Sequence, residues 1–226
     1  MSSLIVDNCH YTQLALQSLL QINGLKNKDI VSLSHINELQ TACHNSSPDI
    51  IFINEDCFTY DPAMGEVLRK VINNHPDTLF FIFISKENLN YQNYIPIRNN
   101  IIILSKSIQT RLVYRLIEHT LRVGETSANA EVLDLTPISL SRTEADILKM
   151  WMSGHNTLHI SQHLNIKEKT VSSHKGNIKR KVKTQNKQTI YHVVKLTDAL
   201  TSGMFVGRVR SFSKTITSSI HALAVA

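Results

Sequence analysis

Apolar residues in the first half of the chain form short continuous runs, separated by segments with helical spacing. Five runs rich in Ile, Leu, Val and Phe predict strands at residues 3–6, 30–33, 49–54, 78–85 and 101–104. The third and fourth runs are apolar at nearly every position, as in strands buried on both faces of a parallel sheet.

Between these runs, apolar residues recur every three or four positions and predict helices at residues 11–22, 36–43, 64–74 and 110–121. In the first helix we expect four leucines to face the core, namely Leu14, Leu16, Leu19 and Leu20. Strands that alternate with helices in this way predict a doubly wound α/β domain.

The second half of the chain has helical spacing only, at residues 143–152, 157–164, 168–182 and 187–200. Ser141 followed by Glu144 is typical of a capping box at a helix start, and Gly154 is typical of a helix end. We therefore divide the chain into an α/β domain at 1–121, a linker at 122–138, an all-α domain at 139–205 and a tail at 206–226. Residues 211–226 of the tail are small, polar and weakly apolar, which indicates a disordered or loosely docked segment.

Charge is divided unevenly between the two halves. Residues 1–136 hold 10 Lys/Arg and 14 Asp/Glu, a net charge of −4, whereas residues 137–226 hold 14 and 4, a net charge of +10. The helix at 168–182 carries much of this positive charge beside an apolar stripe formed by Val171, Ile178 and Val182. Charge alone fits a solvated basic face as well as a polyanion-binding face.

Other chemistry is sparse. Three cysteines form no CxxC pair, which argues against a disulfide framework or a zinc site: Cys9, Cys43 and Cys57. His159 and His163 are one helical turn apart, but no cysteine or carboxylate lies nearby in sequence to complete a metal site. No apolar run reaches the roughly 20 residues of a membrane helix, and the first residues do not resemble a signal peptide. We expect a cytoplasmic, non-enzymatic protein with no cofactor and no metal.

The second half resembles the LuxR/NarL-type helix-turn-helix family. The matching positions are residues 140–144, Gly154, Ile160, Leu164, Ile166, Thr170, Val171, His174, Ile178, Lys181 and Val182. The resemblance implies a four-helix module in which 157–164 is the scaffold helix, 168–182 enters the major groove of DNA and 187–200 is a dimerisation helix.

The family pattern also implies which side chains touch DNA. Ser172, Ser173 and Gly176 would face base edges, and either Lys175 or Asn177 would add to the readout. Gly176 would allow a close approach to the groove, at a cost of about 1 kcal/mol in helix propensity. The remaining positions suit phosphate contacts: Lys169, Thr170, Lys179, Arg180 and Lys183.

The first half resembles a response-regulator receiver domain whose phosphate chemistry has been lost. The strand that would end in the phosphate-accepting aspartate ends instead in Asn54, and an amide is not a competent nucleophile. The acidic pair of the family is reduced to Asp7, while the expected hydroxyl and lysine remain as Ser85 and Lys106. The resemblance implies a receiver scaffold that cannot be phosphorylated.

Taken whole, residues 1–210 are similar to a family of auxiliary activators of bacterial capsular polysaccharide synthesis. The stretches that carry the similarity are residues 54–58, 149–152, 170–181 and 190–194. The resemblance implies three partners: a promoter box in double-stranded DNA, a response regulator of the RcsB type, and the Lon protease that degrades such activators. Two other hypotheses stay open, namely a homodimer that binds DNA alone and a protein that titrates a response regulator away from DNA.

Overall fold

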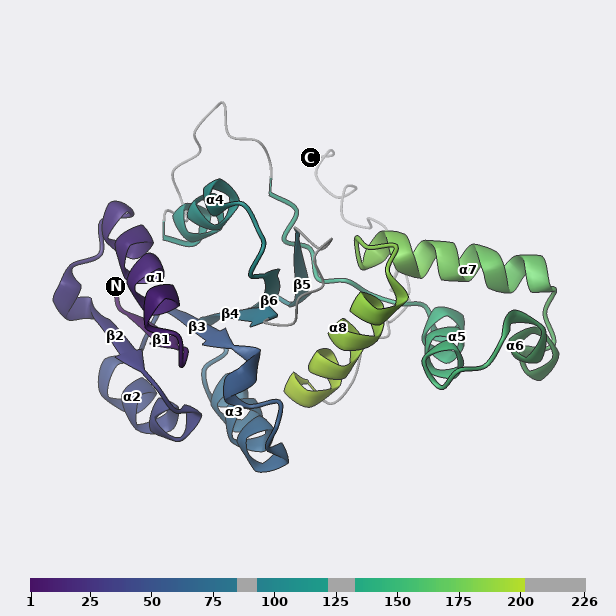
Figure 1. The fold of residues 1–226 in the computed structure, drawn as a ribbon, viewed down its shortest axis with the longest axis horizontal. Helices are drawn as coiled ribbons and strands as arrows, with labels where there is room; N and C mark the ends of the chain where they lie inside the picture. Colours follow the sequence, from purple (N-terminus) through teal and green to yellow (C-terminus); the bar gives the residue numbers. More distant parts are fainter. Residues whose placement is uncertain (85–92, 122–132, 202–226) are drawn as a thin grey trace, which may run out of the picture.

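The computed structural model describes residues 1–84, 93–121 and 133–201. Figure 1 shows an α/β part, with helices on both faces of a sheet, beside a purely helical part. Most of the predicted linker, Ser85 and the whole predicted tail at 206–226 lie outside the described residues.

The α/β part contains a six-stranded sheet in the order β2-β1-β3-β4-β6-β5. Its strands are β1 (Ser3–Val6), β2 (Ile30–Leu33), β3 (Ile50–Asn54), β4 (Leu79–Ile84), β5 (Tyr94–Arg98) and β6 (Ile101–Ser105). All neighbouring strands are parallel except β5, which is antiparallel to β6. The predicted doubly wound sheet is confirmed for the five parallel strands.

The strand β5 was missed because it contains Pro96, which has no N–H group to donate to a ladder. The structure shows why proline is tolerated here, since β5 lies at the edge of the sheet. On its outer side, the backbone carbonyl of Pro96 accepts a hydrogen bond from Ile138 N at 2.9 Å. The segment that leads to the helical part therefore lies along the edge strand.

Two pairs of helices cover the sheet. The helices α1 (His10–Ile22) and α4 (Thr110–Leu121) pack on one face, and α2 (Leu39–Ser46) and α3 (Pro62–Asn74) pack on the other. Short 3-10 turns precede β2 at Asn27–Asp29, precede α2 at Ile36–Glu38, and follow β3 at Glu55–Cys57. The helix predicted at 36–43 is thus a 3-10 turn that leads into α2.

One predicted core position is wrong. Leu16 and Leu20 are buried and Leu19 is half-buried, but the side chain of Leu14 is 45% exposed. Leu14 lies about 160° around α1 from Leu16, because each residue turns an α-helix by about 100°. The four leucines therefore cannot share one face.

The helical part contains α5 (Arg142–Met152), α6 (Thr157–Leu164), α7 (Glu168–Lys181) and α8 (Lys187–Leu200). The capping box is present, because Glu144 N donates to Ser141 Oγ and Ser141 N donates to Glu144 Oε2. Gly154, with a φ of 91°, follows the end of α5. One hydrophobic cluster runs from the α2 and α3 side of the sheet into the helical part, so the two parts share a continuous core.

Candidate nucleic-acid interface

The helix α7 is held in place by one buried stripe. Val171 and Ile178 of α7, together with Val182 after it, are fully buried and form part of the shared core. α7 packs against both α5 and α6. Between α6 and α7, Asn165 adopts a left-handed conformation with φ 51°, which turns the chain from one helix into the next. Among the residues that the structure describes, the opposite face of α7 is exposed.

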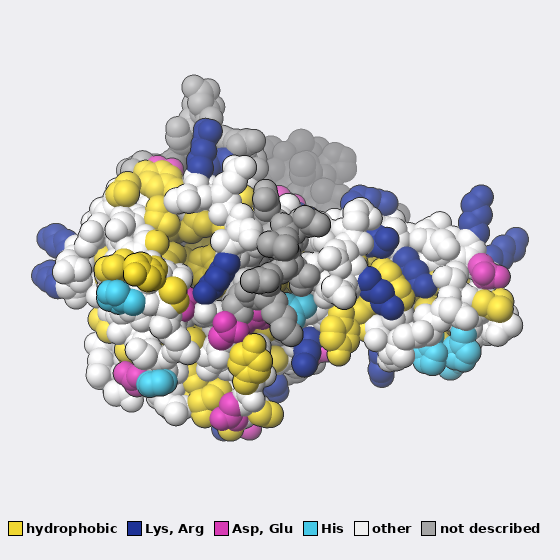
Figure 2. All heavy atoms as spheres, in the orientation of Figure 1, with side chains coloured by type: hydrophobic (Ala, Val, Ile, Leu, Met, Phe, Trp, Pro, Cys, Tyr) yellow, Lys and Arg dark blue, Asp and Glu magenta, His cyan; other side chains and the backbone are white. Residues whose placement is uncertain are grey.

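That outward face carries the residues predicted to meet DNA. Lys169, Ser173, Gly176 and Arg180 are exposed and lie four, three and four residues apart, so they form one stripe. We call these four residues the outer stripe of α7. Thr170 and Ser172, also exposed, flank it. In Figure 2, Lys and Arg side chains project from the helical part at several points along α7.

Gly176 lies in the outer stripe without any steric need for glycine. An added Cβ at this position would meet no atom within 4 Å. Its φ is not in the left-handed region that favours glycine. The fold therefore tolerates a side chain here, and the glycine keeps this part of the outer stripe flat.

Five of the side chains predicted to contact DNA already have partners in this structure: Ser173, Lys175, Asn177, Arg180 and Lys183. Lys175 is half-buried, its Nζ donates to Thr157 Oγ1 at 3.0 Å, and it lies 5.3 Å from the centre of the Trp151 ring. Burial, and then the charges of Lys187 and Lys179, lower the pKa of Lys175. Lys175 thus fastens α7 to α5 and α6.

Ser173 Oγ donates to the backbone carbonyl of Lys169 at 3.0 Å. Two more engaged side chains are Asn177, which lies beside the outer stripe, and Lys183, which lies beyond the end of α7. Asn177 Oδ1 accepts a hydrogen bond from Arg180 Nη2 at 2.9 Å, which orients the guanidinium within the outer stripe. Lys183 follows α7 in a left-handed conformation, and its Nζ lies 4.5 Å from the ring centre of Tyr94 in β5. Lys183 therefore contacts the α/β part. Lys179, the last predicted contact, is half-buried.

The sequence pattern did not reveal the role of Lys181. Its Nζ donates to Glu144 Oε2 at 2.7 Å and to the carbonyl of Ser139 at 2.7 Å. Burial opposes ionisation of Glu144, but the hydrogen bonds from Lys181 and Ser141 outweigh it and lower the pKa of this carboxyl. Lys181 therefore joins the end of α7 to the capping box of α5. No spacing rule links these two positions, which are 37 residues apart.

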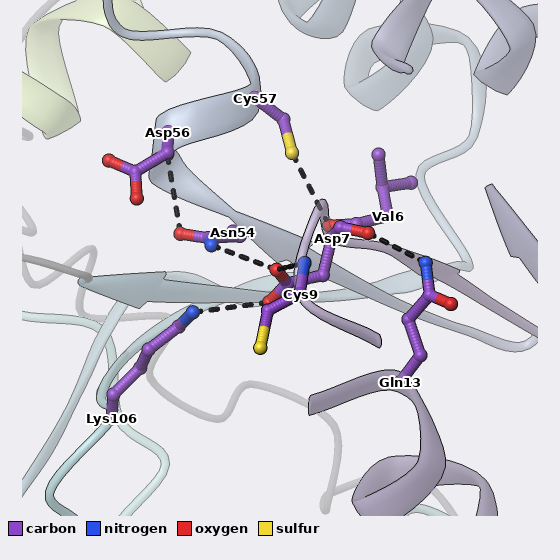
Figure 3. Close-up of polar contacts among 8 residues, drawn as sticks. All are labelled: Val6, Asp7, Cys9, Gln13, Asn54, Asp56, Cys57 and Lys106. Atoms are coloured by element: carbon purple, nitrogen blue, oxygen red, sulfur yellow. Dashed lines mark hydrogen bonds and ion pairs between the residues drawn. The ribbon is translucent and has the colours of Figure 1, made fainter. Parts of the chain in front are cut away.

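Asn54, predicted to stand at the acceptor position, lies in a closed polar cluster, which Figure 3 shows. Asn54 Nδ2 donates to Asp7 Oδ1 at 3.1 Å, and Lys106 Nζ lies 3.2 Å from Asp7 Oδ2. Cys9 N also donates to Asp7 Oδ1, at 2.8 Å, so the carboxylate, which is 2% exposed, is satisfied by protein groups. Asn54 Oδ1 accepts a hydrogen bond from Asp56 N at 3.3 Å. An amide therefore stands at the end of β3, and Lys106 supplies positive charge beside Asp7.

Directly after Asn54, the chain contacts the helical part. Glu55 Oε2 lies 2.5 Å from His192 Nε2 of α8, and both side chains are largely buried. A second contact joins Arg69 Nε of α3 to the carbonyl of Ala199 in α8 at 3.0 Å. These contacts were not predicted, because Glu55 and His192 are 137 residues apart and no motif pairs them.

The described residues contain no group of three or more His, Cys, Asp or Glu side chains placed to hold a metal ion. The rings of His155 and His159 stack with their centres 4.4 Å apart on the outside of the helical part. Among the helices that the structure describes, none has the length and apolarity needed to cross a membrane.

A receiver-like α/β domain and a helix-turn-helix domain with a basic outward helix define a DNA-binding transcription regulator built like a response regulator. Residues 2–129 match the family model described as transcriptional regulator RcsA, N-terminal dimerisation domain. Residues 138–194 match the model described as bacterial regulatory proteins, luxR family. The chain belongs to the RcsA family of transcriptional regulators, a family of DNA-binding proteins rather than enzymes.

Curated relatives agree with this assignment. The transcriptional regulatory protein RcsA of Pantoea stewartii subsp. stewartii is 48% identical over 208 residues, covering 91% of this chain and 99% of the relative. RcsA of Escherichia coli O157:H7 is 45% identical over 206 residues, with the same coverage.

A solved structure supports the fold. RcsB from Salmonella enterica serovar Typhimurium, bound to the rprA promoter in the presence of a phosphomimetic, superimposes with a TM-score of 0.50. The two proteins are 18% identical, and the match covers 89% of this chain and 98% of RcsB. At this identity the similarity concerns the fold alone.

Proposed function

We propose that this protein activates capsule and exopolysaccharide genes as the auxiliary partner of an RcsB-like response regulator on a shared promoter box. The α/β domain binds the partner, and the helical domain provides one of the two DNA-binding modules of the heterodimer. The protein acts in the cytoplasm, and its amount is limited by the Lon protease.

The exposed outer stripe of α7 carries this proposal. Lys169 and Arg180 stand at its two ends and suit phosphate contacts, which fix the position of a protein on the duplex. Ser173 and Gly176 lie between them and suit the edges of bases. Serine hydroxyls both donate and accept, so they discriminate bases weakly. A second DNA-binding module on an adjacent half-site would supply the missing specificity and raise the effective concentration of the first.

The closed cluster around Asn54 supports an unphosphorylated mode of control. Lys106 and Asn54 already contact both oxygens of Asp7, so Mg²⁺ would have to displace these partners, and the amide of Asn54 offers no nucleophile for a phosphoryl group. Regulation then falls on the amount of protein, which fits a substrate of Lon. The partner is expected to be RcsB-like, because RcsB shares this fold and has been solved on promoter DNA.

Fluorescence anisotropy on a capsule-promoter duplex tests the proposal. The full chain is titrated alone and then with an RcsB-like partner, and a scrambled duplex serves as the reference. We expect specific binding only when the partner is present. Tight specific binding by the chain alone would refute the heterodimer and make the protein an autonomous homodimer.

Charge reversal separates DNA binding from titration of a response regulator. The matched pair is Arg180→Glu, in the outer stripe, and Lys28→Glu, exposed on the α/β domain. Arg180 is preferred to Lys175, because Lys175 also packs against Thr157 and Trp151. If Arg180→Glu abolishes promoter binding and Lys28→Glu does not, the outer stripe contacts DNA. The activity of a protein that only titrates a response regulator would be unchanged by either substitution.

A further inference from the structure

A cavity of about 940 Å³ lies where α8 meets α3 and the turn after β3. Its walls come from both domains, since Tyr60 and Arg69 belong to the α/β domain and Lys187, Tyr191 and Lys195 belong to α8. Small-molecule sites usually enclose about 300–1,000 Å³ and often lie between domains. The size and position of this cavity therefore suit a small ligand.

The charge of the cavity is positive. Arg69, Lys187 and Lys195 line it, and in the described part of the chain neither lysine has a carboxylate partner. Glu55 also lines the cavity, but it is 2% exposed and held by His192 at 2.5 Å. Lys187 Nζ lies 5.9 Å from the centre of the Trp151 ring, a contact that leaves its charge without a counterion. An anion that enters the cavity would therefore find two lysine side chains in its wall with little opposing charge.

The cavity also offers flat apolar surfaces. Tyr60 is 75% exposed and Tyr191 is 49% exposed, although tyrosine rings are usually more buried. Tyr60 lies on the side of the α/β domain and Tyr191 lies on α8. Rings at these two positions suit stacking against a planar group.

The two walls are fastened to each other. Arg69 Nε donates to the carbonyl of Ala199, and Glu55 is bonded to His192, so hydrogen bonds join α3 and the turn after β3 to α8. A ligand would therefore enter a site that is already formed, which lowers the entropic cost of binding.

We propose that this interdomain cavity binds a small molecule that combines a planar ring with a phosphate group, as in a nucleoside monophosphate. The ring stacks on Tyr60 or Tyr191, and the phosphate is held by Lys187 and Lys195. Because its walls belong to different domains, the ligand stabilises their docking. This site is separate from the outer stripe of α7, and its function does not depend on promoter binding.

Isothermal titration calorimetry on the full chain tests the proposal with three probes: adenosine monophosphate, adenosine and inorganic phosphate. We expect saturable binding of the nucleotide, with both fragments binding about tenfold or more weakly, because each lacks one half of the interaction. Absence of saturable nucleotide binding, or equal affinity for adenosine, would overturn the assignment.

Variants locate the site. Lys195→Gln and, independently, Lys187→Gln should each weaken nucleotide binding about tenfold or more, as expected for the loss of a charge-assisted hydrogen bond. At least one of Tyr60→Ala and Tyr191→Ala should also weaken it, whereas Tyr11→Ala, exposed on α1, should not. Arg180→Gln controls for the DNA face. Loss of binding in Arg180→Gln with retention in Lys195→Gln would place the nucleotide on α7 and refute the cavity site.

Discussion

Gly176 allows a sharp test, because the needs of the fold and those of a DNA interface oppose each other at this position. Replacing it with alanine adds one methyl group on the outer stripe of α7, where no atom lies within 4 Å. Alanine is favoured over glycine inside a helix by about 1 kcal/mol. For a chain of this size, we expect Gly176→Ala to raise Tm by about 2–4 °C.

The same methyl group should impair DNA binding. If α7 lies in the major groove with Gly176 against the bases, an added methyl group has to displace tightly packed atoms. Overpacking of this kind costs about 1–3 kcal/mol, which corresponds to a loss of affinity of roughly fivefold to 150-fold. Anisotropy on the promoter duplex, with the RcsB-like partner present, measures the affinity, and thermal denaturation of the variant alone measures Tm.

Gly65→Ala is the matched control, since Gly65 also lies within a helix, has no atom within 4 Å of an added Cβ, and belongs to α3 of the α/β domain. It should raise Tm by a similar amount and leave DNA affinity unchanged. A stabilised Gly176→Ala protein that binds DNA as well as the parent would show that this face does not enter the groove. A destabilised one would show that the fold needs the glycine.

Three further predictions concern the polar contacts. Glu144 has a lowered pKa in the folded protein, so its stabilising contribution is complete above the unfolded value of 4.5 and is lost as pH falls through the folded pKa. Glu144→Gln should therefore make the unfolding free energy, measured by urea denaturation, depend less on pH in that acid range. An unchanged pH dependence would contradict the role of the Glu144 carboxylate. Asn54→Asp should lower the unfolding free energy by about 1–3 kcal/mol in EDTA, because a second carboxylate then faces Asp7. Millimolar Mg²⁺ should restore part of this loss. A variant as stable as the parent in EDTA would contradict the contact between residue 54 and Asp7. His192→Ala removes a hydrogen bond from buried Glu55 and should lower the unfolding free energy by about 1–3 kcal/mol. The control His163→Ala, on the exposed face of α6, should not change the unfolding free energy measurably. Equal effects of the two substitutions would contradict the contact between His192 and Glu55.

The periodicity of apolar residues was sufficient to predict the five parallel strands and the helices around them. Runs such as 49–54 and 78–85 are hydrophobic on both faces because the sheet is covered on both sides. The edge strand β5 could not be predicted in the same way. Pro96 excludes it from the interior of a sheet, and only the folded structure shows that this strand lies at an edge.

The candidate DNA face was predictable in outline, since a helix with a buried stripe must expose the opposite side. The exposed positions Lys169, Ser173, Gly176 and Arg180 follow from the placement of Val171 and Ile178. The contacts of Lys175 with Thr157 and of Lys183 with Tyr94 could not be predicted from the spacing of apolar residues. The contacts of a long side chain depend on neighbours that only the tertiary structure brings close. The pairing of Glu55 with His192 was unpredictable for the same reason.

The backbone hydrogen bond from Ile138 N to the carbonyl of Pro96 affects how well the sheet resists aggregation. An edge strand with open backbone groups is a template for pairing with another molecule, and apolar edges of this kind promote aggregation. Tyr94, Ile95 and Ile97 make β5 such an edge. By lying along β5, the segment around Ile138 covers part of it within the same chain. The connection between the two domains thus also protects the edge of the sheet against self-association. Cleavage of the chain near Ile138 would uncover the apolar edge of β5 while both domains are still folded.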